Sequence, residues 1–317
     1  MAFDVVCVGS ALLDIYLKSD KFVKIPSGEF QDGVALCEEF GGKTEVAEVE
    51  VCSGGGGTNV AVSFARKGLK TGLIAETGKD LVAATIKEEL SREGVDPSFL
   101  VEVEGEETGI SSIMVATDGG RSVAVYRGAS KMLTKEDIRW DELRPEWLYI
   151  SSLGGEMALL EGLIGHAKAY GIKVAVNPGK AEIERIGEWG GMKLFAGVEV
   201  LLVNREEATR LTGVDFEDGE VWKSEHCLMG PRTCVITVGK QGGKVCHEGR
   251  CYFYEALQVE TVEETGAGDG FGSGLVAALM KGEDIETAIW WGKKQAASVV
   301  SYMGAKRGLL SLEELHG

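Results

Sequence analysis

Glycines surround Asp269 in the segment from Glu263 to Gly274, which runs directly into the apolar helical pattern of residues 275–279. Small residues let consecutive backbone N–H groups face one point at a helix N-terminus, and that point favours an anion such as a transferring phosphoryl group. Asp269 would repel a phosphate, but it suits a base that takes a proton from an attacking hydroxyl. The pattern predicts phosphoryl transfer to an alcohol, although an isolated Gly-Ala-Gly is also typical of an ordinary strand-to-helix turn.

A second glycine run, Gly54 to Gly57, precedes Asn59 in the first turn of an expected helix. Four glycines let a ligand lie against the backbone, and Asn59 offers both a donor and an acceptor to a polyhydroxylated molecule. Asp14 follows the first apolar strand, so we expect it near the edge of the sheet where open α/β folds bind ligands. The plainer alternatives are a flexible turn for the glycines and a turn aspartate for Asp14.

Two further strand ends carry polar or small residues. Asn204 closes an apolar strand and Glu207 follows three residues later, so both share one face of a helix start. An acid and an amide there suit a magnesium–water shell. Asn at the N-cap with Glu at N3 also stabilises a helix without any ligand. Thr237, Gly239 and Gly242 follow another strand, where either a nucleotide surface or a plain hairpin turn is expected.

Short apolar runs and helical patterns alternate along much of the chain. The expected strands are 3–8, 71–75, 147–151, 173–176, 200–203 and 234–238, and the expected helices are 58–67, 80–93, 157–170, 205–212, 275–281 and 285–302. Alternation of this kind indicates a mostly parallel sheet covered by helices on both faces. The predicted fold class is therefore α/β.

Two segments, at about 12–51 and about 100–127, interrupt the alternation. They contain alternating stretches at 45–51 and 110–116, and Asp118-Gly119-Gly120 forms an expected turn before 121–126. We expect antiparallel strands that project as a small β-sheet lid, which would exclude water from phosphoryl transfer. A dimerisation surface is the alternative and is compatible with a lid. No Pro- or Ser-rich linker divides the chain, so 1–317 is expected to form one domain.

The composition limits the partners. Fifty acidic and 33 basic residues give a net charge of -17, and no run of Lys and Arg supplies a basic patch. Nucleic acid and anionic membranes are therefore not expected partners. No stretch offers the roughly 18 apolar residues of a membrane span, and a cytoplasmic location is expected. The seven cysteines are odd in number and form no Cys-x-x-Cys pair, so reduced thiols are expected, not a disulfide framework or a zinc site.

Common nucleotide-binding motifs are missing. The only Gly-Lys-Thr, at Gly42-Lys43-Thr44, has Cys37 where a P-loop needs its first glycine. No glycine run satisfies Gly-x-Gly-x-x-Gly, so a dinucleotide-dependent oxidoreductase lacks its fingerprint. Kinase chemistry must therefore use another scaffold.

The order of the motifs resembles the ribokinase family of sugar and nucleoside kinases, also called the phosphofructokinase-B family, over essentially the whole chain. The matching residues are Asp14, Gly55-x-x-x-Asn59, Asn204-x-x-Glu207, Thr237-x-Gly239-x-x-Gly242 and Thr265-Gly266-Ala267-Gly268-Asp269. The resemblance implies a ribokinase-like central sheet with a β-lid. It also implies ATP and Mg²⁺ as the donor complex and transfer to a hydroxyl of the substrate.

The resemblance further implies a role for each matching residue. Asp269 would be the catalytic base, and the anion hole would come from Gly266, Ala267 and Gly268. The magnesium–phosphate region would be served by Asn204 and Glu207, and the nucleotide by Thr237, Gly239, Gly242 and Thr265. The sugar would be contacted by Asp14, Gly55, Gly56, Asn59 and, from the segment Tyr126 to Ala129, by Arg127.

Two departures from the family pattern affect what the resemblance implies. Glu263 stands where many members carry Asp, near a site that holds a monovalent cation in some relatives, which argues against potassium activation. Gly56 stands where relatives often carry Lys, which argues for an unphosphorylated acceptor, a sugar first and a nucleoside second. A catalytically silent sugar or nucleotide sensor on the same fold is the rival interpretation. A homodimer formed through the lid is also expected.

Overall fold

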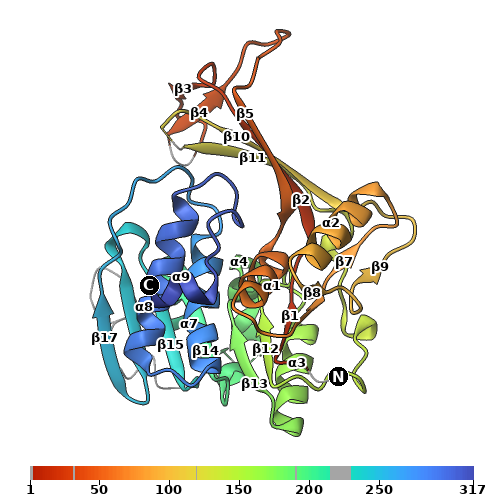
Figure 1. Cartoon of the computed structure of the whole chain (residues 1–317), viewed down its shortest axis with the longest axis vertical. Coiled ribbons are helices and arrows are strands. Elements are labelled where there is room, and N and C mark those ends of the chain that lie inside the picture. The colour runs from red at the N-terminus through yellow and green to blue at the C-terminus, as the bar shows by residue number, and fades with distance from the viewer. Residues whose placement is uncertain (1–2, 31–32, 119, 190, 215–229) are drawn as a thin grey trace.

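The computed structural model describes residues 3–30, 33–118, 120–189, 191–214 and 230–317. Its centre is a sheet of nine described strands in the order β17-β16-β15-β14-β13-β12-β1-β6-β8 (Figure 1). The strands are β1 (Val5–Val8), β6 (Thr71–Ile74), β8 (Val95–Asp96), β12 (Trp147–Ile150), β13 (Lys173–Val176), β14 (Val200–Asn204), β15 (Thr233–Thr237), β16 (Gly243–His247) and β17 (Arg250–Tyr254). Only the pairs β15–β16 and β16–β17 are antiparallel within this sheet as described. The prediction of a mostly parallel α/β sheet is confirmed.

Helices cover both faces of the large sheet. They are α1 (Gly56–Arg66), α2 (Leu81–Arg92), α3 (Met157–Tyr170), α4 (Lys180–Arg185), α5 (Arg205–Thr212), α7 (Ala267–Met280), α8 (Ile285–Val300) and α9 (Leu312–His316). Alternate residues of β1 enter opposite cores: Val5 and Cys7 pack with α1, α2, α7, α8 and α9, and Val6 and Val8 pack with α3, α4 and α5. This arrangement follows from the two-residue period of a strand that is buried on both faces.

The helix bounds follow from residues that satisfy the free backbone groups at each end. Asp80 accepts a hydrogen bond from Ala83 N at the start of α2, and Asp284 does the same for α8. Helices α3 and α5 end at Gly171 and Gly213, each with a φ of 69°. The two helices span the predicted residues 157–170 and 205–212. Among the described residues, no helix is long and apolar enough to cross a membrane.

A second sheet projects from the body at the top of Figure 1. It has the order β11-β10-β2-β5, with β2 (Leu12–Lys18), β5 (Glu48–Gly54), β10 (Gly109–Val115) and β11 (Arg121–Tyr126). The hairpin β3 (Val23–Pro26) and β4 (Val34–Cys37) lies near its outer end, and β7 (Glu76–Thr77) pairs with β9 (Val101–Glu102). The expectation of purely antiparallel strands was wrong for one pair, because β2 and β10 run parallel. The turn expected at 118–120 lies partly outside the described residues.

The two faces of the small sheet differ in character. Asp14 on β2 is paired with Ser111 and Cys52, so these three side chains share the inner face. The next residue, Ile15, is paired with Ser112 and Val51 on the outer face. Asp14 is 6% exposed, whereas Val51 is 52% exposed. The inner face therefore packs against the body, and the outer face is open and largely apolar.

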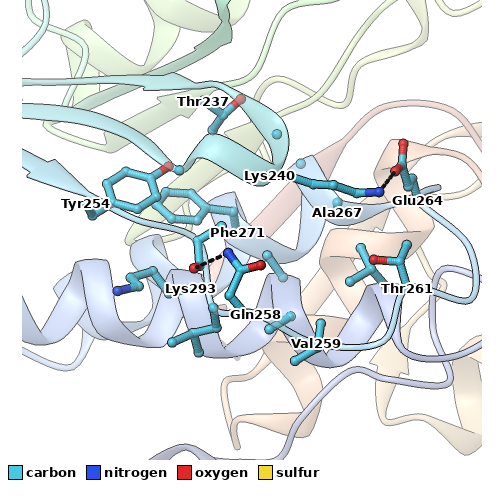
Figure 2. Close-up of a pocket in the computed structure, with 18 residues that line it drawn as sticks. Thr237, Lys240, Tyr254, Gln258, Val259, Thr261, Glu264, Ala267, Phe271 and Lys293 are labelled. Atoms are coloured by element: carbon cyan, nitrogen blue, oxygen red, sulfur yellow. Dashed lines mark hydrogen bonds and ion pairs between the residues drawn. The ribbon is translucent and has the colours of Figure 1, made fainter.

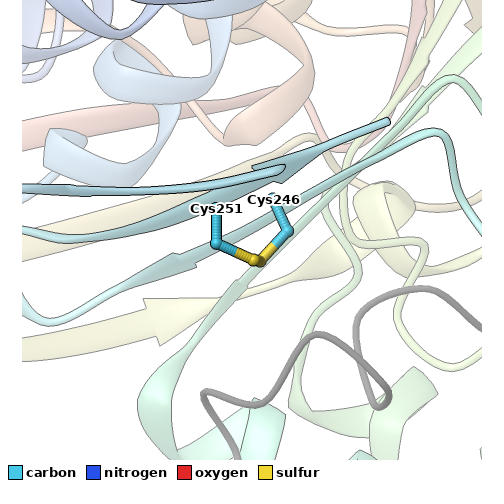
Figure 3. The surroundings of a disulfide bond; sticks show 2 residues. All are labelled: Cys246 and Cys251. Atoms are coloured by element: carbon cyan, nitrogen blue, oxygen red, sulfur yellow. A yellow bond between two sulfur atoms is a disulfide. The ribbon is translucent and has the colours of Figure 1, made fainter. Parts of the chain in front are cut away.

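The expectation of reduced thiols throughout was wrong for two cysteines. Cys246 of β16 and Cys251 of β17 form a disulfide, which is shown in Figure 3. The cause is the tight turn at Glu248 and Gly249, both with positive φ, because the resulting register places Cys246 directly opposite Cys251. Four cysteines are free, namely Cys7, Cys37, Cys52 and Cys234, and Cys227 lies outside the described residues.

Candidate active site

Strand β1 lies between β12 and β6, so the chain connections diverge on either side of it. Ligands in open α/β sheets bind in the crevice beyond the carboxyl ends of such strands. Ser10 and Ser151 follow β1 and β12 at this edge, and Asn204 and Thr237 stand opposite each other at the ends of β14 and β15. The sheet therefore brings together segments that are far apart in the sequence.

Asp269 lies in the first turn of α7, whose N-cap is Gly266 with a φ of 79°. A Cβ atom on Gly266 would lie 2.6 Å from Ala305 Cβ, so both conformation and space require glycine. A Cβ atom on Gly268 would meet no atom within 4 Å. The first N–H groups of a helix have no acceptor within the helix. The turn can therefore offer donors to the open space beside the Asp269 carboxylate.

The glycine run before α1 contacts two carboxylates. A Cβ atom on Gly54 would lie 2.1 Å from Asp14 Oδ2, and one on Gly56 would lie 3.6 Å from Asp269 Oδ1. Gly55 has a φ of 91°, and a Cβ atom there would lie 2.5 Å from Ser10 O. A side chain at Gly54 would clash with Asp14, and one at Gly56 would extend toward Asp269, so the glycines let both carboxylates lie next to this backbone.

A hydrogen-bonded side chain holds each carboxylate. Asn59 Nδ2 donates to Asp269 Oδ2 at 2.9 Å, and Tyr16 donates to Asp14 Oδ2 at 3.5 Å. Burial raises the pKa of Asp269, while the Asn59 hydrogen bond and the charge of Lys306 oppose that rise. Burial likewise raises the pKa of Asp14, against the hydrogen bond from Ser111 and the charge of Lys306. A base with a raised pKa accepts a proton more readily.

A cavity of about 370 Å³ is lined in part by the first turn of α7 (Figure 2). It is lined by two sequence-predicted segments, one with Thr237, Gly239 and Gly242 and the other with Ala267 and Gly268. Residues 256–261 and one side of α8 form much of the remaining wall. The predicted nucleotide loop and the predicted anion hole therefore line one cavity.

The shape of this cavity depends on Gly242 and on two aromatic rings. Gly242 has a φ of 94°, and a Cβ atom there would lie 1.9 Å from Tyr254 O. The rings of Tyr254 and Phe271 stack at 5.0 Å with an interplanar angle of 14°. Figure 2 also shows the 3.1 Å ion pair between Lys240 and Glu264 near the cavity edge. The loop 237–242 is a hairpin connection that also lines the cavity. The hairpin alternative is therefore confirmed, and the nucleotide surface stays a prediction.

Asn204 and Glu207 form a capping box at the start of α5. Asn204 N donates to Glu207 Oε2 at 2.8 Å, and Glu207 N donates to Asn204 Oδ1 at 3.0 Å. Burial raises the pKa of Glu207. The capping alternative for this pair is therefore confirmed, and the magnesium role stays a prediction that the cap does not exclude, since Glu207 Oε1 is not used by it.

Two predicted site residues lie apart from this grouping. The Arg127 side chain is exposed, and its guanidinium forms no ion pair among the described residues. Thr265 is not among the residues that line the cavity, and its N–H donates to Glu263 Oε1 at 2.7 Å. The structure thus brings Asp14, the glycine run, Asn59 and Asp269 together, and leaves Arg127 outside that cluster.

Two residues near the site, Lys306 and Ser151, were not predicted from the sequence. Lys306 donates to Ser53 O, to Thr58 Oγ1 at 2.8 Å and to Asn59 Oδ1 at 3.0 Å. Ser151 is 3% exposed, and its Oγ has no hydrogen-bond partner among the described residues. A Cβ atom on Gly56 would lie 3.1 Å from that oxygen. Position after a strand was the signal available for Ser151, whereas Lys306 belongs to no local pattern.

The fold and the grouping of these residues define an α/β phosphotransferase for small molecules. Residues 2–311 match the family described as pfkB family carbohydrate kinase, so the chain belongs to that family and is a carbohydrate kinase. Ribokinase from Haemophilus influenzae is 29% identical over 270 residues, covering 84% of this chain and 86% of that protein.

Solved structures show the same ribokinase-like fold. The structure of Arabidopsis thaliana ribokinase complexed with ribose and ATP matches with a TM-score of 0.77 and 21% identity, covering 100% of this chain and 98% of that one. Adenosine kinase from Sinorhizobium meliloti matches with a TM-score of 0.78 and 21% identity, covering 100% and 99%. The predicted family and fold are confirmed, and sugar and nucleoside kinases both share this fold.

Proposed function

We propose that this protein transfers the γ-phosphoryl group of ATP to a hydroxyl of an unphosphorylated sugar. The observation that carries the proposal is the position of Asp269. Its carboxylate lies beside the open glycine run that contacts Asp14, and its helix turn lines the cavity of about 370 Å³. One carboxylate therefore lies between an acceptor side and a donor side. A nucleoside is the second candidate acceptor, because Gly56 leaves extra room on the acceptor side.

The donor side fits a nucleotide. The cavity volume lies within the roughly 300–1,000 Å³ of small-molecule sites, and the ribokinase of Arabidopsis was solved with ATP. A carboxylate oxygen is the kind of ligand that Mg²⁺ binds, often through water. Glu207, with Asn204 beside it, is our candidate for that contact. Bound Mg²⁺ would neutralise phosphate charge during transfer.

The chain's own residues would act on a proton and on a developing charge. Asp269 would accept the proton of the acceptor hydroxyl as the new O–P bond forms and the bond to the leaving ADP oxygen breaks. The N–H groups of Gly266, Ala267 and Gly268 would hold the negative charge of the transferring group. The small sheet would cover the acceptor and exclude water, since Asp14 lies on its inner face.

The acceptor side favours a neutral polyhydroxylated ligand. It presents the Asp14 carboxylate and the buried Ser151 hydroxyl, and both groups are able to hydrogen-bond to sugar hydroxyl groups. The three hydrogen bonds of Lys306 go to protein atoms, and Gly56 contributes no ammonium. A dianionic sugar phosphate would also enter against a net charge of -17. The charges near the site therefore support an unphosphorylated acceptor.

An ADP-release assay with a panel of acceptors tests the function. We expect turnover with ATP and a neutral sugar such as ribose or fructose, weaker turnover with adenosine or inosine, and little with fructose 6-phosphate. Asp269→Asn should lower kcat by roughly 10²- to 10⁴-fold, the contribution of a positioned general base. Preference for a phosphorylated sugar would overturn the acceptor class. Binding of sugar and ATP without turnover would support the sensor.

We also propose that two copies of the chain associate through the outer face of the small sheet. Leu13, Ile15 and Leu17 lie on that face, and they are flanked by Val49 at 55% and Val51 at 52% exposure. Apolar faces of this kind mark interaction sites. Ile15→Glu should convert a dimer into a monomer in light scattering. A wild-type monomer at micromolar concentration would refute the proposal.

A cytoplasmic location remains part of the proposal, because a kinase needs the compartment that supplies ATP. The free cysteines Cys7, Cys37, Cys52 and Cys234 agree with a reducing compartment. The disulfide between Cys246 and Cys251 is the feature that argues the other way. Fractionation of the source cells, with this chain traced by antibody, tests the location.

A further inference from the structure

Lys306 is buried at 4% exposure in the segment between α8 and α9. Its ammonium group donates to Ser53 O at the end of β5, to Thr58 Oγ1 at 2.8 Å and to Asn59 Oδ1 at 3.0 Å. An ammonium has three N–H donors and no acceptor. All three donors therefore bond to residues that flank the glycine run, one in Ser53 before it and two in the first turn of α1 after it.

This contact decides which way the Asn59 amide points. A donor that cannot accept must face the amide oxygen, so Asn59 Oδ1 turns toward Lys306. Asn59 Nδ2 then faces Asp269 Oδ2, to which it donates at 2.9 Å. The opposite amide orientation would place N–H groups against the ammonium and two oxygens against each other. The contacts form a chain from Lys306 through Asn59 to Asp269.

We propose that Lys306 is a positioning residue for the phosphoryl-transfer reaction. Lys306 fixes the Asn59 amide, so that one carboxylate oxygen of Asp269 is held by Asn59 and the other faces the acceptor. Asp269 Oδ1 is the oxygen near Gly56, where the acceptor is expected. The inference rests on the proposed function of Asp269 as the base. It assigns a role to a residue that belongs to none of the motifs.

Charge supports the same assignment. Burial lowers the pKa of Lys306, whereas Cys52, Glu89, Asp14 and Asp269 act to raise it. The ammonium in turn lowers the pKa values of Asp14 and Asp269. One buried cation therefore balances both site carboxylates, and removal of it leaves two partly buried negative charges uncompensated.

The expected sign of a pH effect follows from the groups around Asp269. Lys306 lies on one side, Tyr149 of β12 lies on another and carries no charge at neutral pH because its pKa is raised, and Asn59 is not titratable. Removal of the positive charge raises the pKa of Asp269, so the carboxylate ionises only at higher pH. The acid limb of kcat/KM should then move to higher pH, by about one unit for loss of a nearby charge.

Three variants separate orientation from charge. Lys306→Met removes both the donors and the charge, and we expect the shifted acid limb together with a loss of kcat of up to about a hundredfold. Lys306→Gln keeps an amide donor for Asn59, so it should shift the limb but lose less kcat. Lys67→Met is the control, because Lys67 is equally buried in the same region but donates to Ser63 and Gln295. Its acid limb should stay in place.

A double-mutant cycle and an NMR titration test the role of Lys306 further. In a double-mutant cycle with Asn59→Ala, the losses for Lys306→Met should not add, because both act on one contact chain. Carbon NMR titration of labelled aspartates, with Asp269 assigned from Asp269→Asn, should show a raised Asp269 pKa in both Lys306→Met and Lys306→Gln. If Lys306→Met does not fold, Lys306→Gln alone gives the measurement. This readout needs no turnover, so it distinguishes a failure of the inference from a failure of the kinase proposal. An unchanged Asp269 pKa, or an unchanged acid limb, would overturn the inference.

Discussion

Gly268→Val should abolish most turnover while leaving the fold intact. A Cβ atom at Gly268 would meet no atom within 4 Å, and Gly268 lines the cavity of about 370 Å³ next to Asp269. The valine methyl groups would therefore extend into the space for the transferring phosphoryl group and screen the N–H donors of the α7 turn. Loss of one such donor costs about 3 kcal/mol in the transition state. That cost corresponds to a fall in kcat of roughly a hundredfold.

Two other glycines provide the comparison. Gly165 lies exposed in α3, where a Cβ atom also meets nothing within 4 Å, so Gly165→Val makes the same change in a helix far from the site. In Gly266→Val, the added Cβ atom would lie 2.6 Å from Ala305 Cβ, and valine would have to adopt a φ of 79°. This variant should therefore unfold at a lower temperature. Steady-state kinetics and thermal unfolding of all three variants test the reasoning. If Gly268→Val is folded and matches Gly165→Val in kcat, the anion-hole interpretation is wrong.

Three further predictions concern other parts of the molecule. Asp14→Ala should raise KM for the acceptor by about tenfold or more, the loss of a charged hydrogen bond, and leave KM for ATP nearly unchanged; equal shifts would contradict an acceptor role. Glu207→Gln should raise the Mg²⁺ concentration for half-maximal rate, whereas Glu314→Gln, in the capping box of α9, should change only stability, by about 1 kcal/mol. Burial lowers the pKa of Lys67 to about 7, so the unfolded chain binds this proton more tightly and stability should rise between about pH 7 and pH 10. In Lys67→Met, the free energy of unfolding measured with urea should rise less between these pH values. An unchanged dependence of this free energy on pH would refute the prediction.

The elements that the sequence predicts best are those whose ends are marked by local chemistry. Helices α3 and α5 end at Gly171 and Gly213, so their bounds could be inferred from the chain alone. The strand β15 begins one residue earlier and ends one residue earlier than predicted, because no cap marks a strand end. Strand order and the parallel pairing of β2 with β10 depend on contacts between distant segments, and no local pattern encodes them.

The candidate site also has parts that local sequence patterns predict and parts that depend on contacts between distant segments. Asp269 and the glycine run are recognisable because turns need small residues at fixed positions. The far wall of the cavity comes from residues 256–261 and from α8, and these residues come together only through packing. Lys306 becomes important only once the fold buries it beside Asn59. The disulfide, by contrast, could have been predicted from the sequence, because Glu248-Gly249 marks a two-residue turn that places Cys246 opposite Cys251.

An ion pair links the small sheet to the loop that precedes α7. Arg121 on the edge strand β11 places its Nε 3.1 Å from Glu263 Oε1, and the same oxygen accepts from Thr265 N at 2.7 Å. Glu263 is 1% exposed, whereas the Arg121 side chain keeps 32% of its exposure, so only the carboxylate end of the pair is desolvated. Asp14 lies on the inner face of the same sheet as Arg121. The small sheet therefore connects Asp14 to the loop that begins α7, so the position of Asp14 relative to Asp269 depends on this sheet as well as on the large one.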